Sequence, residues 1–452
     1  MMHAPMLIRN GRLIDPSSGV DQVSDLLLVD GRIAGVGKGL GAPDGADVME
    51  AKGLVVAPGL IDLHVHLREP GNEDVETIAS GARAAAAGGF TAVCAMPNTD
   101  PVTDNQAAIG FIVKQAAQAG GARVYPIGAV SLGERGEQLA EFGELVAAGA
   151  VAVSDDGRPV ASSHLMRMAL SYARTFGIPV ADHCEDPTLP RGVMHEGVVS
   201  TRLGLRGIPA ASEEIMVARD AILAELTGGH VHLCHISTRG SVELIRRARD
   251  RGTHVTAEVT PHHLTLTHEA CTGYNTNAKM SPPLREPGDV DAVRAGLKDG
   301  TLDVIATDHA PHAYDAKERE FDDAPNGIIG LETALALGIS ELVGGGVLTL
   351  PELLERMSTK AARAFSLPGG TLAKGSIADV VIFDPAATWI VDPTAFLSKS
   401  RNTPYAGRTL KGRVFRTIIG GKTVYESGDG RSRTKADPDK EGRRTGTDKT
   451  DG

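Results

Sequence analysis

The chain has 452 residues, 42% of them hydrophobic and 23% charged, a composition typical of a folded globular protein. Its length exceeds that of one ordinary domain, so we expect one large domain and a smaller one. The formal net charge of −11 argues against nucleic acid or an anionic membrane as the main partner. Since no apolar run approaches about eighteen residues, neither a signal peptide nor a membrane span is predicted.

The four cysteines are scattered along the chain without paired spacing. They are Cys94, Cys184, Cys234 and Cys271. This usage fits a reducing compartment better than a disulfide framework. We therefore expect a cytoplasmic protein.

Both ends of the chain have the pattern of a β-structure. Residues 1–57 alternate apolar and polar side chains between Asn-Gly and Asp-Gly turn signals, and similar texture returns over residues 369–428. We expect these two pieces to pair in one small β-sandwich domain. Residues 429–452 carry charges of both signs and no large apolar side chain, which predicts a disordered tail.

Between these ends, over residues 58–368, apolar runs of strand length alternate with helix-like stretches rich in Ala, Glu and Leu. This alternation indicates a parallel sheet with helices on both faces. The eight runs are LIDLHVH, TAVCAMP, RVYPIGAV, AVAVSDD, IPVADHCE, VHLCHIS, HVTAEVTPHH and DVIATDHAPH. Eight such units predict an α/β fold with a closed, TIM-like (β/α)8 barrel, whose reactive residues lie at the carboxyl ends of the strands.

In five of these runs, histidine or aspartate stands where the apolar stretch ends. The residues are His64, His66, Asp155, Asp156, His183, His235, Asp308, His309 and His312. A lone histidine after a strand is more often a hydrogen-bonded structural residue than a ligand. Five such strand ends in a fold that gathers them nevertheless predict a metal site. Imidazole and carboxylate without thiolate favour Zn²⁺, one or two ions per chain, with manganese or cobalt as substitutes.

The motifs around these residues resemble the amidohydrolase superfamily, and within it the bacterial-type dihydroorotases. The stretches that carry the resemblance are GLIDLHVHLREPG, AMPNTDP, SDDG, HCED, HIST, TPHHL, KMSPPLR, ATDHAPH and GLET. DLHVHLREPG together with ATDHAPH is highly specific. The resemblance extends from about Met6 to Gly428, and the closing GSIADVVIFDP is also typical of the superfamily.

The resemblance implies a ligand set for two metal ions with a carboxylate between them. The matching residues are His64, His66 and Asp308 for the first metal, and His183 and His235 for the second. Hydantoinases, dihydropyrimidinases and allantoinases use a carboxylated lysine on the fourth strand as the bridge. Here that strand reads AVAVSDDG, without a lysine at its end. Asp156 is the predicted bridge, and Asp155 is the alternative.

The resemblance also implies a substrate site beside the metals. Arg68, after the His-x-His pair, and Asn98, in Met-Pro-Asn-Thr, match residues that hold a substrate carboxylate. Arginine suits this role because it forms a bidentate clamp. His312 matches a second histidine that binds the substrate.

Two positions of the predicted substrate site depart from the family pattern. Ser281 stands where Asn usually precedes Pro-Pro-Leu-Arg, and Asn326-Gly327 stands where Phe-Gly is often found before GLET. We expect all three residues to bind the substrate, since backbone groups can hold its ring there. The polar segment AYDAKEREFDDAP after His312 is either a mobile lid or a static surface loop.

Taken together, the resemblance implies a reversible interconversion of N-carbamoyl-L-aspartate and L-dihydroorotate plus water in pyrimidine (UMP) synthesis. The expected chemistry is attack by a metal-bound hydroxide, with Asp308 as general acid and base. We expect a homo-oligomer with a small-molecule substrate, and aspartate transcarbamoylase is a candidate partner. Two alternatives stay open: another cyclic amidase such as a hydantoinase or allantoinase, and a non-catalytic homologue that acts as a scaffold for the transcarbamoylase.

Overall fold

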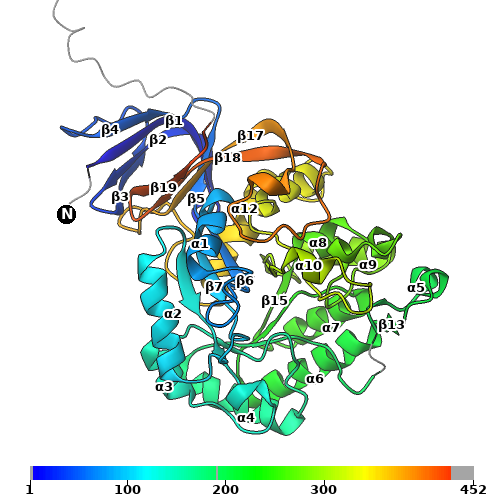
Figure 1. The fold of residues 1–452 in the computed structure, drawn as a ribbon. Coiled ribbons are helices and arrows are strands. Elements are labelled where there is room, and N and C mark those ends of the chain that lie inside the picture. The colour runs from blue at the N-terminus through cyan, green and yellow to red at the C-terminus, as the bar shows by residue number, and fades with distance from the viewer. Residues whose placement is uncertain (1–3, 190–191, 429–452) are drawn as a thin grey trace, which may run out of the picture.

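Strands from both ends of the chain pair in one eight-stranded sheet (Figure 1). The structure is a computed structural model that describes residues 4–189 and 192–428. The predicted tail over residues 429–452 lies outside the described residues. The strands of this sheet are β1 (Met6–Asp15), β2 (Val20–Val29), β3 (Arg32–Gly37), β4 (Asp47–Glu50), β5 (Val55–Pro58), β17 (Val380–Ile390), β18 (Thr409–Ile419) and β19 (Lys422–Glu426).

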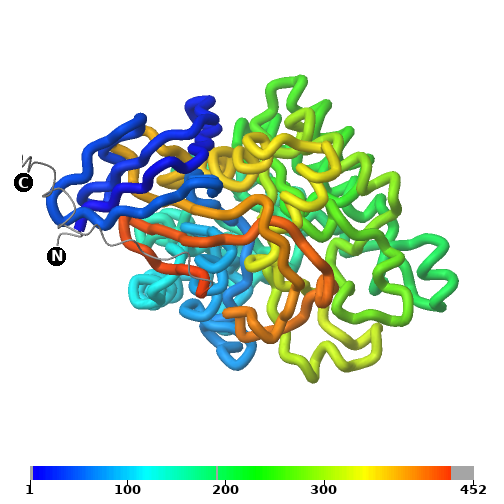
Figure 2. The backbone as a smooth tube through the Cα atoms, turned by 90° about the horizontal axis from the view of Figure 1, so that it is seen from above, coloured from blue at the N-terminus to red at the C-terminus, as the bar shows by residue number. Residues whose placement is uncertain are grey.

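The two ends meet where β5 pairs with β17. The order is β19-β18-β17-β5-β1-β2-β3, and β4 pairs with the other end of β1. One apolar core joins both ends, since Ile8 and Val56 lie in the same buried cluster as Val380 and Ile418. Figure 2 shows the blue N-terminal strands beside the orange and red C-terminal ones. The predicted small domain built from β-strands of both ends is confirmed, and its eight strands form one continuous sheet where a β-sandwich was expected.

The middle of the chain forms the predicted barrel of parallel strands. Its strands are β6 (Leu60–Val65), β7 (Phe90–Ala95), β8 (Arg123–Pro126), β9 (Gly128–Ala129), β10 (Val153–Ser154), β11 (Val180–Asp182), β14 (Val231–Leu233), β15 (Val255–Val259) and β16 (Val304–Ile305). β8 and β9 together occupy one barrel position, because β8 pairs with β7 and β9 pairs with β10. The barrel closes between β6 and the segment after β16, where His66 N–H donates to His309 O at 2.9 Å.

Most of the helices lie around the barrel strands and cover them, whereas α5 projects at the edge of the molecule (Figure 1). The helices are α1 (Ile78–Ala87), α2 (Gln106–Gln118), α3 (Phe142–Ala148), α4 (Ser163–Phe176), α5 (Val198–Leu203), α6 (Ala211–Thr227), α7 (Arg239–Asp250), α8 (Pro261–Thr265), α9 (Pro287–Asp299), α10 (Tyr314–Lys317), α11 (Ala334–Leu337), α12 (Leu350–Leu354) and α13 (Lys360–Ala364). Local sequence sets their ends. The Thr77 hydroxyl caps α1 by accepting from Ser80 N, and Asn105 caps α2 in the same way.

Short irregular elements complete the fold. The 3₁₀ turns are η1 (Leu132–Glu134), η2 (His268–Cys271), η3 (Thr276–Ala278) and η6 (Pro393–Ala395), the π-helical segments are η4 (Gly338–Val343) and η5 (Glu355–Thr359), and β12 (Met194–His195) pairs with β13 (Gly207–Ile208). Among the described helices, none combines the length and apolar character that a membrane crossing requires. We propose residues 58–368 as the barrel domain, with 1–57 and 369–428 as the two parts of the sheet domain.

The barrel interior is packed with small side chains. One buried cluster takes residues from strands all round the barrel, among them Ala92, Ala152, Ala181 and Ala306. A second, larger cluster packs the outer faces of the strands against the helices. Both faces of the parallel strands are therefore buried, as their near-continuous apolar runs predict.

Candidate metal centre

The histidines and aspartates predicted as ligands come together at the carboxyl ends of the barrel strands. Nε2 of His66 lies 3.1 Å from Oδ1 of Asp308, and Nε2 of His64 lies 3.5 Å from the same oxygen. Nδ1 of His183 lies 2.9 Å from Nε2 of His235. The fold thus brings the predicted histidines together in two pairs.

Asp156 lies between these two histidine pairs. Its Oδ2 is 3.3 Å from Nε2 of His64 and 3.4 Å from Nε2 of His66. Its Oδ1 is 3.4 Å from Nε2 of His235 and 3.7 Å from Nδ1 of His183. One carboxylate oxygen therefore faces each pair, which is the arrangement that a bridging ligand needs.

The neighbouring Asp155 is directed elsewhere. Its carboxylate accepts hydrogen bonds from the backbone N–H of Ser131 at 3.0 Å and from the Ser131 hydroxyl at 2.5 Å. Those bonds hold it to the loop after β9. Of the two alternatives that the sequence left open, the geometry supports Asp156 as the bridge.

The donor set fits divalent cations. His64 Nε2 and Asp156 Oδ1 are buried and have no hydrogen-bond partner in the part of the chain that the structure describes. Nitrogen and oxygen ligands at about 2.0–2.1 Å from a tetrahedral zinc ion lie about 3.3 Å from one another. The spacings around Asp156 match this value. Buried polar atoms without partners are costly, and bound metal ions would satisfy them.

The backbone at the site adopts conformations that non-glycine residues rarely show. Arg68 has φ 62°, His235 has φ 34° and Asp308 has φ 47°. Such left-handed residues cost free energy and cluster at functional sites, where the surrounding structure enforces them. Here they allow residues just beyond the strand ends to turn their side chains towards a common centre.

Three of the four metal-site histidines, His64, His66 and His183, have a second hydrogen bond that fixes the ring. His64 Nδ1 lies 2.7 Å from Glu258 Oε1, and His66 Nδ1 lies 2.9 Å from Asn98 Oδ1. His183 Nε2 lies 3.1 Å from Glu185 Oε2. Such outer contacts select the ring nitrogen that is left for a metal.

The electrostatics of the cluster favour its ionised carboxylates. Burial opposes the charge of Asp156, but the imidazoles of His64, His183 and His235 outweigh it and hold the pKa of this carboxyl well below its usual value. The pKa of Asp308 is likewise lowered, because His64 and His66 outweigh its burial. Both carboxylates are therefore ionised at neutral pH, in the form that binds a cation.

The predicted substrate residues form a second group beside the metal cluster. Arg68 Nε donates to Pro311 O at 3.2 Å, and its Nη2 lies 3.4 Å from His312 Nε2. His312 Nε2 also lies 2.7 Å from Asn326 O. Among the described residues no carboxylate pairs with Arg68. Burial lowers the pKa of its guanidinium to about 10, so the charge is retained at neutral pH.

Position 327 requires glycine because its backbone packs closely against His312 and Ala310. A Cβ at this position would lie 2.5 Å from Cδ2 of His312 and 2.6 Å from Ala310 O. Asn402 joins the same segments, since its Nδ2 donates to Ala310 O at 2.9 Å and to Gly327 O at 3.0 Å. Residues far apart in the chain thus hold Asn326 and Gly327 against His312.

Ser281 lies on the other side of the site. Its hydroxyl donates to Glu185 Oε2 at 2.7 Å, and Glu185 in turn contacts His183. A cavity of about 800 Å³ opens here, and His183, Ser281 and Asn326 are in its lining. Of the predicted substrate residues, Ser281 and Asn326 therefore adjoin a space large enough for a small molecule.

Three residues of the site were missed by sequence reasoning. Glu258 is a lone carboxylate within the buried strand β15, and this isolated charge was a signal that could have found it. Glu185 stands inside the HCED motif beside His183. Asn402 has no local signal, because its role depends on contacts with segments some 75 to 92 positions away.

The barrel, the terminal sheet domain and the histidine–aspartate cluster define the class of cyclic amidohydrolases. Solved structures of this kind are similar over nearly their whole length. The L-hydantoinase (dihydropyrimidinase) from Arthrobacter aurescens superimposes with a TM-score of 0.83 at 25% identity, covering 95% of this chain and 97% of its own. The dihydropyrimidinase from Brevibacillus agri NCHU1002 gives 0.80 at 25% identity, covering 93% and 95%.

Sequence relatives narrow the class to one family. The dihydroorotase of Anaeromyxobacter sp. (strain K) is 56% identical over 426 residues, which cover 94% of this chain and 98% of that protein. The dihydroorotase of Pelobacter propionicus is 54% identical over 421 residues, covering 93% and 99%. A family model described as Dihydro-orotase-like matches residues 53–241. The chain belongs to the dihydroorotase family.

Proposed function

We propose that this protein acts as a dihydroorotase, interconverting N-carbamoyl-L-aspartate and L-dihydroorotate in pyrimidine biosynthesis. The observation that carries the proposal is the guanidinium of Arg68, which stands beside the metal cluster without a carboxylate partner among the described residues. An unpaired, partly buried cation of this kind suits a substrate with a free carboxylate. Dihydroorotate has one, whereas hydantoin and allantoin have none.

We propose Zn²⁺ as the resident metal, with one or two ions per chain. His64, His66 and Asp308 would hold the first ion, and His183 and His235 would hold the second. Asp156 would bridge the two positions. Imidazole and carboxylate donors at the observed spacings support this assignment. When bound, such a metal supplies a nucleophilic water at neutral pH and polarises the amide carbonyl.

Asp308 is the proposed general acid and base. Its lowered pKa keeps the carboxylate ionised, so it can accept the proton of the attacking water. The C–N bond of the ring amide then breaks, and the same carboxyl returns the proton to the departing nitrogen. In ring closure these steps run in reverse, and water leaves.

The remaining residues bind and orient the substrate in this proposal. Arg68 binds the substrate carboxylate, and the Asn98 side chain, already fixed by its contact with His66, offers its amide N–H. His312, Asn326 and Gly327 form the adjoining wall through the contacts described above. Ser281 completes the opposite side of the cavity.

We further propose a cytoplasmic homo-oligomer. The four cysteines are buried and unpaired, which supports a reducing compartment. Helix α6 exposes Ile215, Ile222 and Leu226, and exposed apolar side chains of this kind are typical of subunit contacts. A complex with aspartate transcarbamoylase stays a prediction from the family resemblance.

The proposal is tested by ring-opening assays with purified protein on dihydroorotate, hydantoin and allantoin, together with ring closure of carbamoyl aspartate. We expect turnover of dihydroorotate and carbamoyl aspartate, lost on metal chelation and restored by Zn²⁺. Faster opening of hydantoin or allantoin would instead establish another cyclic amidase. Zinc-loaded protein that turns over only after aspartate transcarbamoylase is added would show an enzyme dependent on that partner.

A further inference from the structure

A column of hydrogen bonds leads away from the metal cluster along the barrel interior. Glu258 accepts from His64 Nδ1 at 2.7 Å through Oε1, and its Oε2 lies 3.1 Å from His232 Nε2. His232 Nδ1 lies 2.8 Å from the Thr256 hydroxyl, which lies 2.7 Å from His230 Nε2. His64, Glu258 and His232 are fully buried.

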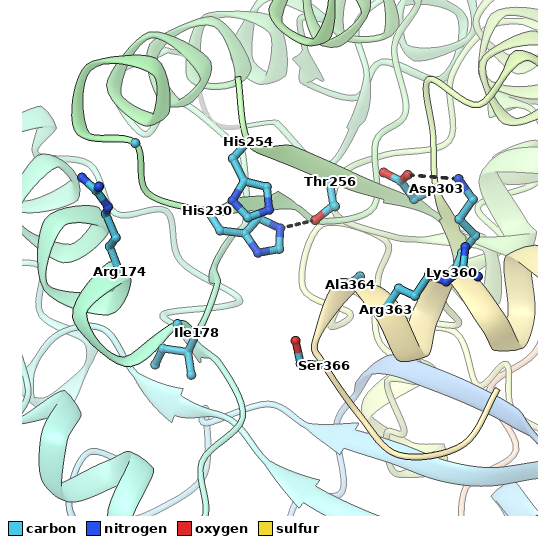
Figure 3. A pocket seen from close by; sticks show the side chains of 12 residues that line it. Arg174, Ile178, His230, His254, Thr256, Asp303, Lys360, Arg363, Ala364 and Ser366 are labelled. Atoms are coloured by element: carbon cyan, nitrogen blue, oxygen red, sulfur yellow. Dashed lines mark hydrogen bonds and ion pairs between the residues drawn. The ribbon is translucent and has the colours of Figure 1, made fainter. Parts of the chain in front are cut away.

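The far end of this column reaches a cavity at the amino ends of the strands. This cavity, of about 410 Å³, is lined by His230, His254 and Thr256 among others. Figure 3 shows the hydrogen bond between His230 and Thr256 in its wall. The rings of His230 and His254 are stacked there, 4.0 Å apart. The column thus joins the metal cluster to the opposite end of the barrel.

The side chains of the column can be assigned as donor or acceptor in each hydrogen bond from their chemistry. An ionised Glu258 only accepts, so His64 and His232 both donate N–H to it. With its N–H on Nε2, the His232 ring offers the lone pair of Nδ1, which accepts the hydroxyl proton of Thr256. The Thr256 oxygen in turn accepts from His230 Nε2. At the other end, Nε2 of His64 is therefore the ring nitrogen that is left for a metal ion.

We propose that Glu258, His232 and Thr256 form a positioning network that fixes the ring and tautomer of His64 and thereby sets the metal affinity of the site. The inference rests on the proposed metal centre. According to this inference, the metal affinity of the site also depends on Thr256, which is separated from His64 by the side chains of Glu258 and His232. None of the three network residues touches the substrate site described above.

The test compares isosteric variants by two readouts that do not depend on turnover: Zn²⁺ affinity by chelator competition and the visible absorption of the Co²⁺-loaded protein. Glu258→Gln has one acceptor oxygen for two imidazole donors. We expect about 10- to 100-fold weaker Zn²⁺ binding, as for other contacts to metal-bound histidines. Thr256→Val removes the hydroxyl at constant size, and we expect at least about threefold weaker binding and an altered Co²⁺ spectrum.

Two further variants separate positioning from general stability. Thr256→Ser keeps the hydroxyl and is expected to retain wild-type affinity. Thr91→Val removes another buried hydroxyl, one that donates to Leu60 O on the neighbouring strand β6, and is expected to leave both readouts unchanged. The Thr256 and Thr91 variants therefore test the positioning network even where Glu258→Gln fails to fold.

Wild-type affinity and spectrum in Thr256→Val would overturn the network. Equal losses in Thr256→Val and Thr91→Val would also overturn it, since they would show only a general loss of barrel stability. Failure of the wild-type protein itself to bind Zn²⁺ or Co²⁺ would refute the proposed metal centre, and the network with it.

Discussion

Oδ2 of Asp156 lies 3.3 Å from Nε2 of His64, while the other oxygen of the same carboxylate faces His183 and His235. This single side chain joins the two histidine pairs. Where hydantoinases and their relatives are expected to use a carboxylated lysine, the aspartate brings its carboxylate directly from the end of β10. The proposed metal centre would therefore need no covalent modification to form.

Asp156→Asn keeps the size of the side chain but removes its charge. We predict that Zn²⁺ affinity falls by at least about 100-fold, more than the loss of an outer contact causes. Asp155→Asn is the matched control, because Asp155 bonds to Ser131 instead. Metal content by mass spectrometry after dialysis checks both. Equal loss in the two variants would show that Asp156 has no special place as the bridge.

Arg68→Met removes the proposed clamp for the substrate carboxylate. Hydrogen bonds to charged groups contribute about 1.5–3 kcal/mol, which corresponds to roughly 10- to 150-fold. We predict a loss of this size in kcat/KM for dihydroorotate, mainly through KM, with unchanged metal content. The control is Arg135→Met, an exposed residue in the lining of the cavity beside Ser281, for which the change in kcat/KM should stay within about threefold. A wild-type KM in Arg68→Met would remove Arg68 from substrate binding.

Gly327→Ala places a methyl group 2.5 Å from His312 Cδ2, so the imidazole must move. Displacement of a substrate-positioning group by about 1 Å can lower the rate about 100-fold. We predict a loss of at least about tenfold in kcat/KM, with the metal retained. Gly110→Ala, on α2 with open space around it, should match wild type in steady-state kinetics. Full activity of Gly327→Ala would show that His312 has no positioning role.

Lys317 holds residues 325–327 in place through hydrogen bonds to their carbonyl groups. Because its side chain can be charged, its contribution to the free energy of unfolding depends on pH. Its ammonium donates to Pro325 O at 2.9 Å and to Gly327 O at 3.1 Å. Burial, with a contribution from Lys279, lowers the pKa of Lys317 to about 7. Between this value and the unfolded value of about 10.4, the unfolded chain binds a proton that the folded chain has released. The contribution of Lys317 to the free energy of unfolding therefore rises as pH increases over this range.

Urea unfolding of wild type and Lys317→Met between pH 7 and pH 9 checks this sign. We predict that the free energy of unfolding of wild type minus that of the variant increases with pH. A difference for Lys317 that falls with rising pH would contradict the assigned burial of its charge.

Much of the fold followed from periodicity and spacing. Each of the eight apolar runs became a barrel strand, and the histidine or aspartate after five of them reached the common centre because parallel strands end at one rim. The choice between Asp155 and Asp156 was beyond the sequence, since adjacent residues differ only in the direction that the backbone gives them. Contacts such as Asn402 with Gly327 join distant segments, and no local pattern encodes them.

Dihydroorotate ring opening by wild type and Asp308→Asn, measured beside their metal content, tests the central claim most directly. General acid–base catalysis contributes about 10²–10⁴-fold, and Asp308 is also a proposed metal ligand. We predict zinc-loaded, active wild-type protein and a variant whose turnover falls by at least about 100-fold at matched zinc content. A zinc-loaded Asp308→Asn variant that turns over at the wild-type rate would contradict the account.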